Sequence, residues 1–212
     1  IYLFEPNKKI FHELEKNFNK YNNIFFYNFG LGSKNKKEQF FISNENMGES
    51  SSFLKPKKHE IVKPEITFTK SKMMLEIKRF DSLDITNIDF LNIDTQGYEL
   101  EVLKGFQTQL KNILFIHCEI NRDFVYENNA LVKDIDLFLE RNDFIRIKTI
   151  WGKYNEPYGN AIYLKKEFIS YSKYLIVKIY NKFQYTNIYY FLRIFSNFSR
   201  LKFYIKKFIN LI

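Results

Sequence analysis

The sequence of 212 residues has few of the residues that cross-link or sharply turn a chain: one cysteine, seven glycines and four prolines. The single Cys118 excludes an internal disulfide framework and a cysteine-based zinc cluster, and its apolar neighbours predict a buried thiol. No uncharged apolar stretch of about 18 residues occurs, so no membrane-spanning helix is predicted. No secretory signal is visible, and we expect a cytoplasmic protein.

Acidic residues are nearly absent from the C-terminal part of the chain. Residues 165–212 hold ten Lys and Arg and one acidic residue, Glu167, so they carry the whole net charge of +9. Residues 1–164 hold 23 residues of each sign. The basic character of the whole chain therefore does not indicate a nucleic-acid-binding core. The change in composition predicts a core of residues 1–165 and a basic, aromatic-rich helical tail of residues 166–212.

Two interpretations of this tail stay open. Its aromatic and basic side chains at helical spacing are typical of an amphipathic element on an anionic membrane surface, which would bring a cytoplasmic protein to the membrane periphery. The same helices are equally suited to packing on the core or to homodimerisation. Nucleic acid ranks below both as a partner, because the sequence contains no recognised binding module.

Apolar runs and helical spacings alternate along the core. The expected strands lie at residues 1–5, 24–27, 38–42, 73–80, 88–94, 113–120, 144–151 and 160–164. Helical periodicity follows several of these strands, while the polar residues 43–70 are interpreted as a mobile loop or insertion. This alternation predicts an α/β fold with a mostly parallel, Rossmann-like sheet covered by helices on both faces.

Three carboxylates stand at the ends of predicted strands: Glu5, Asp94 and Glu119. Ligands of open parallel sheets bind outside the carboxyl ends of the strands, and a carboxylate after the second strand typically binds ribose hydroxyls. One such residue would be interpreted as a solvated loop residue or helix cap; three in succession favour a binding site. Asp94 suits a helix cap equally well, and Glu99 is interpreted as a favourable helix-dipole partner.

An ordered set of segments resembles one enzyme family. The segments are Phe4-Glu5-Pro6, Asn28 to Gly32, Ser51 to Leu54, Asp81 to Leu83, and Asn92 to Gly105 with the sequence NIDTQGYELEVLKG, followed by Glu119. In this order they are similar to FkbM-type methyltransferases, whose corresponding pattern is KIDVEGAELEVLKG. The resemblance covers about residues 1–165, and it is the ordered set rather than any single block that makes it specific.

The resemblance implies an S-adenosylmethionine-dependent O-methyltransferase with a class I, Rossmann-like sheet, acting on a hydroxyl of a saccharide, glycan or related metabolite. By position, Glu5 corresponds to the ribose-binding carboxylate, and Asn28 and Phe29 correspond to residues that line the adenine. Asp94 and Gln96 correspond to positions beside the methionine moiety and the methyl group.

Glu119, which ends the next strand, would face the methyl acceptor according to the same resemblance. A base is useful when the acceptor is an alcohol, and Asp94 is the first candidate, with Glu119 the second. His59, in the polar segment, is a less favoured candidate. Carboxylate oxygens of Asp94 and Glu119 suit a hard cation, but no ligand spacing requires one, so no metal is predicted.

The chain also departs from the family pattern. The family's first strand and glycine-rich turn are absent, and the first residue is Ile rather than Met, which predicts an N-terminally incomplete copy with a gap in the sheet. The departure keeps an alternative open, namely a non-catalytic binding or scaffold module without a cofactor pocket. A nicotinamide-dependent oxidoreductase also fits Glu5, but it leaves the segment from Ile93 to Gly105 unexplained.

Overall fold

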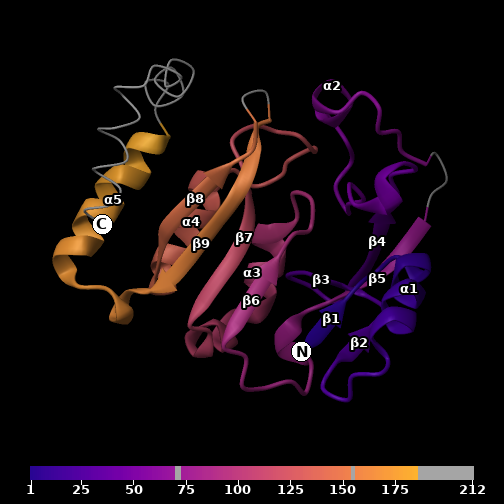
Figure 1. The fold of residues 1–212 in the computed structure, drawn as a ribbon, viewed down its shortest axis with the longest axis horizontal. Coiled ribbons are helices and arrows are strands. Elements are labelled where there is room, and N and C mark those ends of the chain that lie inside the picture. The colour runs from indigo at the N-terminus through magenta and orange to yellow at the C-terminus, as the bar shows by residue number, and fades with distance from the viewer. Residues whose placement is uncertain (70–72, 154–155, 186–212) are drawn as a thin grey trace.

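The computed structural model describes residues 1–69, 73–153 and 156–185 (Figure 1). The strands are β1 (Tyr2–Phe4), β2 (Phe25–Tyr27), β3 (Gly30–Leu31), β4 (Lys36–Phe40), β5 (Met73–Lys78), β6 (Phe90–Ile93), β7 (Phe115–Asn121), β8 (Phe144–Trp151) and β9 (Tyr158–Lys165). The α-helices are α1 (Lys8–Phe18), α2 (His59–Val62), α3 (Glu99–Phe106), α4 (Val132–Arg141) and α5 (Tyr171–Gln184). Short 3-10 helices occupy Asn46–Gly48, Phe80–Ser82, Gln107–Asn112 and Lys166–Phe168. The predicted mixed α/β fold is therefore confirmed.

The described strands form three sheets rather than one. Their orders are β1-β2, β3-β5-β4 and β6-β7-β9-β8. The pairs β1-β2, β3-β5 and β6-β7 are parallel, whereas β4-β5, β7-β9 and β8-β9 are antiparallel. The described residues thus do not form the single, mostly parallel sheet expected from the sequence. One physical reason is that β8 and β9 form a hairpin, which brings β9 back antiparallel between β7 and β8.

The sheets of β1 and β6 are separate, and residues of both line one cavity. Among the described strands, β1 pairs only with β2, and β6 pairs only with β7. Residues 1–6, which include β1, and residues 87–96, which include β6, line the same cavity.

The hydrophobic core is centred on β7. Ile116, Cys118 and Ile120 share one face of this strand, as the period of two requires, and each is fully buried. Leu103 of α3 and Ile135 of α4 belong to the same buried cluster. Each such aliphatic side chain contributes about 1.5–3 kcal/mol when fully buried. The predicted burial of Cys118 is confirmed, and burial raises the pKa of its thiol.

Residues 43–69 are more structured than their polar composition suggested. Their backbone is tied to the core by hydrogen bonds such as Phe41 N to Ser52 O and Ser52 N to Phe41 O, at 2.8 and 3.0 Å. Ser43, Ser50 and Ser52 are buried. The interpretation as a mobile loop missed this order because the segment is held by hydrogen bonds of buried serine hydroxyls. Such bonds leave no apolar periodicity in the sequence.

The first part of the basic tail packs on the core. Helix α5 lies against β8, where Val177 is buried and Asn181 Nδ2 donates to the carbonyl of Arg146 at 2.7 Å. Tyr174 donates to Glu140 Oε1 at 3.0 Å. Residues 186–212 lie outside the described residues, so the expected membrane or dimer contacts of that part stay predictions. Within the described part, no helix has the length and apolar character needed to cross a membrane.

Gly105 tests the packing of α3 on the chain after β3. A Cβ atom at Gly105 would lie 2.2 Å from the carbonyl oxygen of Gly32, which is a backbone atom. Alanine is favoured over glycine in a helix by about 1 kcal/mol, but relieving this overlap requires a backbone shift costing about 1–3 kcal/mol. We expect Gly105→Ala to lower the free energy of unfolding, measured by urea denaturation. The neighbouring Lys104→Ala is the control, and a stabilised Gly105→Ala variant would contradict the close approach.

Candidate functional site

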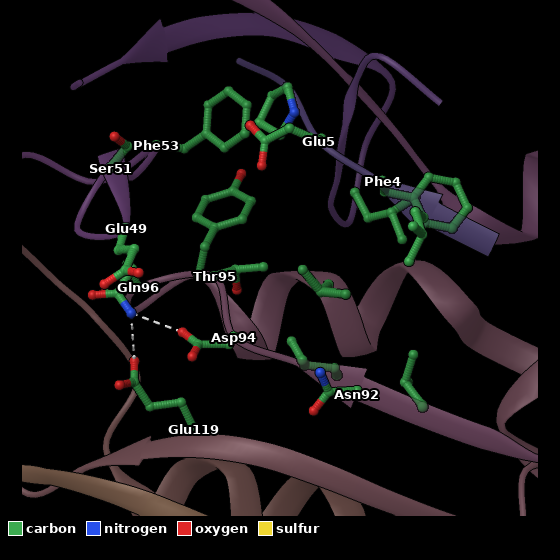
Figure 2. A pocket seen from close by; sticks show the side chains of 18 of the residues that line it. Phe4, Glu5, Glu49, Ser51, Phe53, Asn92, Asp94, Thr95, Gln96 and Glu119 are labelled. Carbon is green, nitrogen blue, oxygen red and sulfur yellow. Dashed lines mark hydrogen bonds between the residues drawn. The ribbon is translucent and has the colours of Figure 1, made fainter. Parts of the chain in front are cut away.

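The candidate site is a cavity of about 1090 Å³ at the ends of β1 and β6 (Figure 2). Four of the residues proposed from the sequence line it: Glu5 after β1, Asp94 and Gln96 after β6, and Glu119 near the end of β7. These positions are up to 114 residues apart in the chain. The structure therefore brings the three predicted strand-end carboxylates to one cavity.

Asn28 and Phe29, the other two predicted residues, do not line the cavity. The Asn28 amide donates to the carbonyl oxygens of Glu5 and Pro6, at 2.9 and 3.3 Å. Phe29 is buried against Phe4, with ring centroids 5.8 Å apart. Both side chains thus support the chain around β1, because the groups expected to face a ligand are used in packing and backbone hydrogen bonds.

Glu99 fixes the turn that carries Asp94 and Gln96. Its Oε1 accepts hydrogen bonds from Thr95 N at 3.0 Å, from Thr95 Oγ1 at 3.2 Å and from Gly97 N at 2.9 Å. Within this turn Gln96 and Gly97 have φ angles of 53° and 94°, in the left-handed region. The N-cap of α3 is Tyr98, so Asp94 does not cap the helix. Glu99 is therefore a buried hydrogen-bond acceptor that stabilises the turn, and not only a favourable partner of the helix dipole.

The amide of Gln96 lies between two of the predicted carboxylates. Its Nε2 donates to Asp94 Oδ1 at 2.7 Å and to Glu119 Oε2 at 3.4 Å, as the dashed lines in Figure 2 mark. At its other end, Oε1 accepts from the Tyr126 hydroxyl at 3.1 Å. Gln96 therefore holds Asp94 and Glu119 at a fixed spacing while Asp94 stays exposed to the cavity.

Burial sets the protonation of the acidic groups. Glu99 is fully buried, and desolvation, with Asp94 nearby, raises its pKa to about 7. The pKa of Glu119 is raised well above its ordinary value by desolvation first and then by the charges of Glu99 and Asp94. Glu5 also has a raised pKa because it is half-buried, although Asn7 N donates to its Oε1 at 2.6 Å. The cavity is therefore a place where carboxyl groups retain protons more readily than in water.

Several residues of the site carried no signal that sequence reasoning used. The Ser52 hydroxyl donates to the carbonyl of Gln96 at 2.8 Å, and the Tyr126 hydroxyl donates to the carbonyl of Ser50 at 2.8 Å. The segment from Ser51 to Leu54 was part of the family resemblance, so its serines could have been assigned to the site. Tyr126 follows β7 in a polar segment, and nothing in its spacing marks it.

His59, the less favoured candidate from the polar segment, does line the cavity. It is buried, with its ring 5.2 Å from that of Phe68 and 5.4 Å from that of Tyr126, centroid to centroid. Its Nδ1 is buried and has no hydrogen-bond partner among the described residues. Burial, and then the charge of Lys63, lower the pKa of the imidazole. His59 is thus a neutral ring on the cavity wall at physiological pH.

Part of the remaining wall is aromatic. Phe80 and Phe106 stack with centroids 4.1 Å apart and planes 10° from parallel, and Phe4 meets Phe80 at 6.0 Å. All three rings line the cavity. Such a wall suits a flat apolar group, whereas the carboxylates suit hydroxyl groups and cations. The cavity can therefore bind a ligand that has both kinds of group.

A family model described as the methyltransferase FkbM domain matches residues 1–146. A comparison with curated proteins found no match. Among solved structures, the crystal structure of the methyltransferase FkbM from Methylobacillus flagellatus KT is similar in fold, with 11% sequence identity and a TM-score of 0.49. That similarity covers 77% of this chain and 36% of the Methylobacillus chain.

The buried ring of His59 predicts a pH-dependent stability. Because its pKa is lowered in the folded protein, the unfolded chain binds more protons once the pH falls below about 6.5. We expect the free energy of unfolding of the wild type to fall, relative to that of His59→Phe, between about pH 7.5 and about pH 5.5. Urea denaturation at several pH values measures this difference.

The control places the same new side chain in the same short helix. Ile61 is exposed, so Ile61→Phe removes no titratable group and buries none. Its stability should follow the pH dependence of the wild type. A His59→Phe variant whose pH profile coincides with that of the wild type would contradict the effect of burial on this imidazole.

Proposed function

The chain belongs to the FkbM methyltransferase domain family, and we propose from this membership that it forms the site of an S-adenosylmethionine-dependent O-methyltransferase. The proposed acceptor is a hydroxyl of a saccharide, glycan or related metabolite. The observation that carries the proposal is the convergence of Glu5, Asp94 and Glu119 on one cavity. A class of reaction that needs ribose recognition, cation stabilisation and proton removal would use carboxylates at these positions.

The residues present fit S-adenosylmethionine in chemistry and in size. Glu5 offers a carboxylate for ribose hydroxyls, and the ring pair of Phe80 and Phe106 offers an apolar surface for adenine. The cavity, at about 1090 Å³, lies at the upper end of the range of about 300–1,000 Å³ usual for small-molecule sites. This volume leaves room for an acceptor beside the cofactor.

We assign different roles in methyl transfer to Asp94 and Glu119, which lie on the rim of the cavity. When bound, S-adenosylmethionine supplies a methyl group on a positively charged sulfonium. Asp94 and Glu119 lie close together on the rim, where an anionic carboxylate favours that positive charge. The acceptor oxygen must be held in line with the methyl group, and positioning alone supplies much of such catalysis.

Of the two candidate bases, Asp94 is favoured. Desolvation by burial, and then the charges of Glu99 and Asp94, raise the pKa of Glu119, which favours a role as a hydrogen-bond donor to the acceptor over removal of its proton. Asp94 is exposed to the cavity, where it can accept the proton of an acceptor hydroxyl. Gln96 donates hydrogen bonds to both carboxyl groups and so fixes their positions relative to each other.

A binding or scaffold module without methyl transfer is the second candidate. It is favoured by the separation of β1 from β6, because the described wall between these strands contains no glycine-rich turn. In this case the cavity would bind a ligand without bringing a methyl donor and an acceptor into line. Cofactor titration separates the two candidates.

The location and partners of the protein are also proposals. We place the site in the cytoplasm, where S-adenosylmethionine would be available, and the basic tail at a membrane periphery or a dimer interface. The packing of α5 on β8 supports a tail that starts on the core.

Isothermal titration calorimetry with S-adenosylmethionine tests cofactor binding. We expect saturable binding to the wild type and weaker binding, by about tenfold, to Glu5→Gln, because a hydrogen bond to a charged group contributes about 1.5 kcal/mol or more. Glu13→Gln, at an exposed position of α1, removes the same charge away from the cavity and should bind like the wild type. A folded chain that does not bind the cofactor would rule out the proposed methyltransferase.

Transfer of a radiolabelled methyl group onto a panel of mono- and oligosaccharides tests the assignment of the base. Asp94→Asn should lower kcat by about 100-fold, since general-base catalysis contributes about 10² to 10⁴, and should change KM much less. Glu119→Gln keeps a hydrogen-bond donor and should retain more activity. Equal losses in both variants would contradict the division of roles, and Glu13→Gln again serves as the control.

A further inference from the structure

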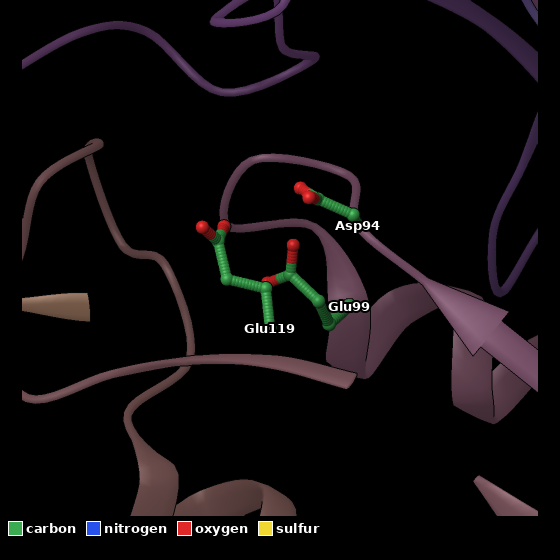
Figure 3. A group of neighbouring side chains, drawn as sticks. All are labelled: Asp94, Glu99 and Glu119. Atoms are coloured by element: carbon green, nitrogen blue, oxygen red, sulfur yellow. The ribbon is translucent and has the colours of Figure 1, made fainter. Parts of the chain in front are cut away.

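Three carboxyl groups lie close together, as Figure 3 shows, and two of them, Asp94 and Glu119, line the cavity. Asp94 follows β6, Glu99 lies in the first turn of α3, and Glu119 belongs to β7. One oxygen from each lies within 4.8 Å of the other two. Carboxylates that were brought together only by chance would be expected to turn apart into water, but two of these three are held by burial.

The decisive group is the second oxygen of Glu99. Oε1 is used by the turn, through the three donors from Thr95 and Gly97. Oε2 is fully buried and has no hydrogen-bond partner among the described residues. A buried polar atom without a partner costs about 1–3 kcal/mol, and more when it carries charge. Because Glu99 is one of the three clustered carboxyl groups, its unpartnered oxygen calls for a proton or a positively charged partner.

Protein side chains do not supply that partner. Among the described ion pairs, none includes Asp94, Glu99 or Glu119. Lys63 lies on the cavity wall, but its Nζ is over the ring of Tyr158, at 5.2 Å from the centroid. Among the described residues, no cationic side chain therefore forms an ion pair with the cluster of carboxylates.

The amide of Gln96 compensates only part of the cluster. Its Nε2 donates to Asp94 and Glu119 but forms no hydrogen bond with Glu99. Because its Oε1 is bonded to Tyr126, the amide group is held beside the cluster rather than inside it. The amide nitrogen of Gln96 therefore bridges Asp94 and Glu119, while Glu99 Oε2 has no hydrogen-bond partner among the described residues.

We propose that Asp94, Glu99 and Glu119 bind one divalent cation of the oxygen-preferring class, Ca²⁺, Mn²⁺ or Mg²⁺. Two ligand atoms on opposite sides of an ion at about 2.4 Å are about 4.8 Å apart, and no two of the three carboxyl oxygens are farther apart than this. Three carboxylate oxygens form a ligand set typical of these cations. Asp94 is exposed, so the remaining coordination positions face the cavity and bind water or a hydroxyl oxygen.

This cation site goes beyond the proposed methyl transfer and does not depend on it. A cation at this point would hold an acceptor hydroxyl between Asp94 and Glu119 and would lower the pKa of that hydroxyl. It would also replace Gln96 as the group that fixes the spacing of the two outer carboxylates. The test therefore measures cation binding without cofactor or acceptor.

Mn²⁺ binding to the full chain tests the site, with the loss of the electron paramagnetic resonance signal of free Mn²⁺ as the readout. We expect one saturable site in the wild type and affinities lower by about tenfold or more in Glu99→Gln and Asp94→Asn, which corresponds to about 1.4 kcal/mol or more. Glutamine at position 99 retains a carbonyl oxygen for Thr95 N and Gly97 N. It replaces only the free oxygen, so the turn remains supported.

Glu13→Gln is the matched control, because it removes one acidic charge from the exposed face of α1. It should bind Mn²⁺ like the wild type. Circular dichroism and thermal unfolding check that each variant folds, and Glu119→Gln serves the same test if Glu99→Gln does not fold. Absence of a saturable site, or a site retained equally in all folded variants, would overturn the proposal. Cofactor titration in the presence of a chelator is a separate measurement, so the two proposals fail independently.

Discussion

The site depends on one buried carboxylate, Glu99, and on its hydrogen bonds to the turn before it. Left-handed backbone at Gln96 and Gly97 is unfavourable for the non-glycine residue, and an independent turn of this shape would not persist. Three donors on Oε1 of Glu99 offset that cost. The same turn ends β6, starts α3 and presents Asp94 to the cavity. The position of Asp94, the candidate base, is therefore fixed by Glu99, which does not itself line the cavity.

This arrangement produces the unusual electrostatics of the rim. The turn uses only one oxygen of Glu99, so the other is desolvated next to Asp94 and Glu119. Desolvation and repulsion act in the same direction, and they raise the pKa of Glu99 to about 7 and raise that of Glu119 as well. A proton or a cation in the cluster would relieve this repulsion. The burial of Glu99, which the turn requires, thus places three carboxyl groups together in a position suited to binding a cation or transferring a proton.

The sequence predicted much of this site but little of what supports it. Strand ends identified Glu5, Asp94 and Glu119, because apolar runs locate buried strands and parallel topology brings their ends together. Asn28 and Phe29 do not line the cavity, since position in a family pattern does not tell whether a side chain faces a ligand or the core. The burial of Glu99 depends on contacts with a turn whose φ angles no periodicity encodes. The three separate sheets likewise depend on how hairpins return along the chain, which alternation of elements does not specify.

The cavity has two chemically different sides, and this difference restricts how a ligand can lie in it. Phe4, Phe80 and Phe106 form the aromatic side, while Asp94 and Glu119 form the acidic side. A flat apolar group placed against the carboxylates would lose its contacts with the rings and would remove water from the charged groups. A ligand with a flat base at one end and a positive charge at the other would therefore favour the direction that puts the base against the rings. That direction would put its charged end near the exposed Asp94.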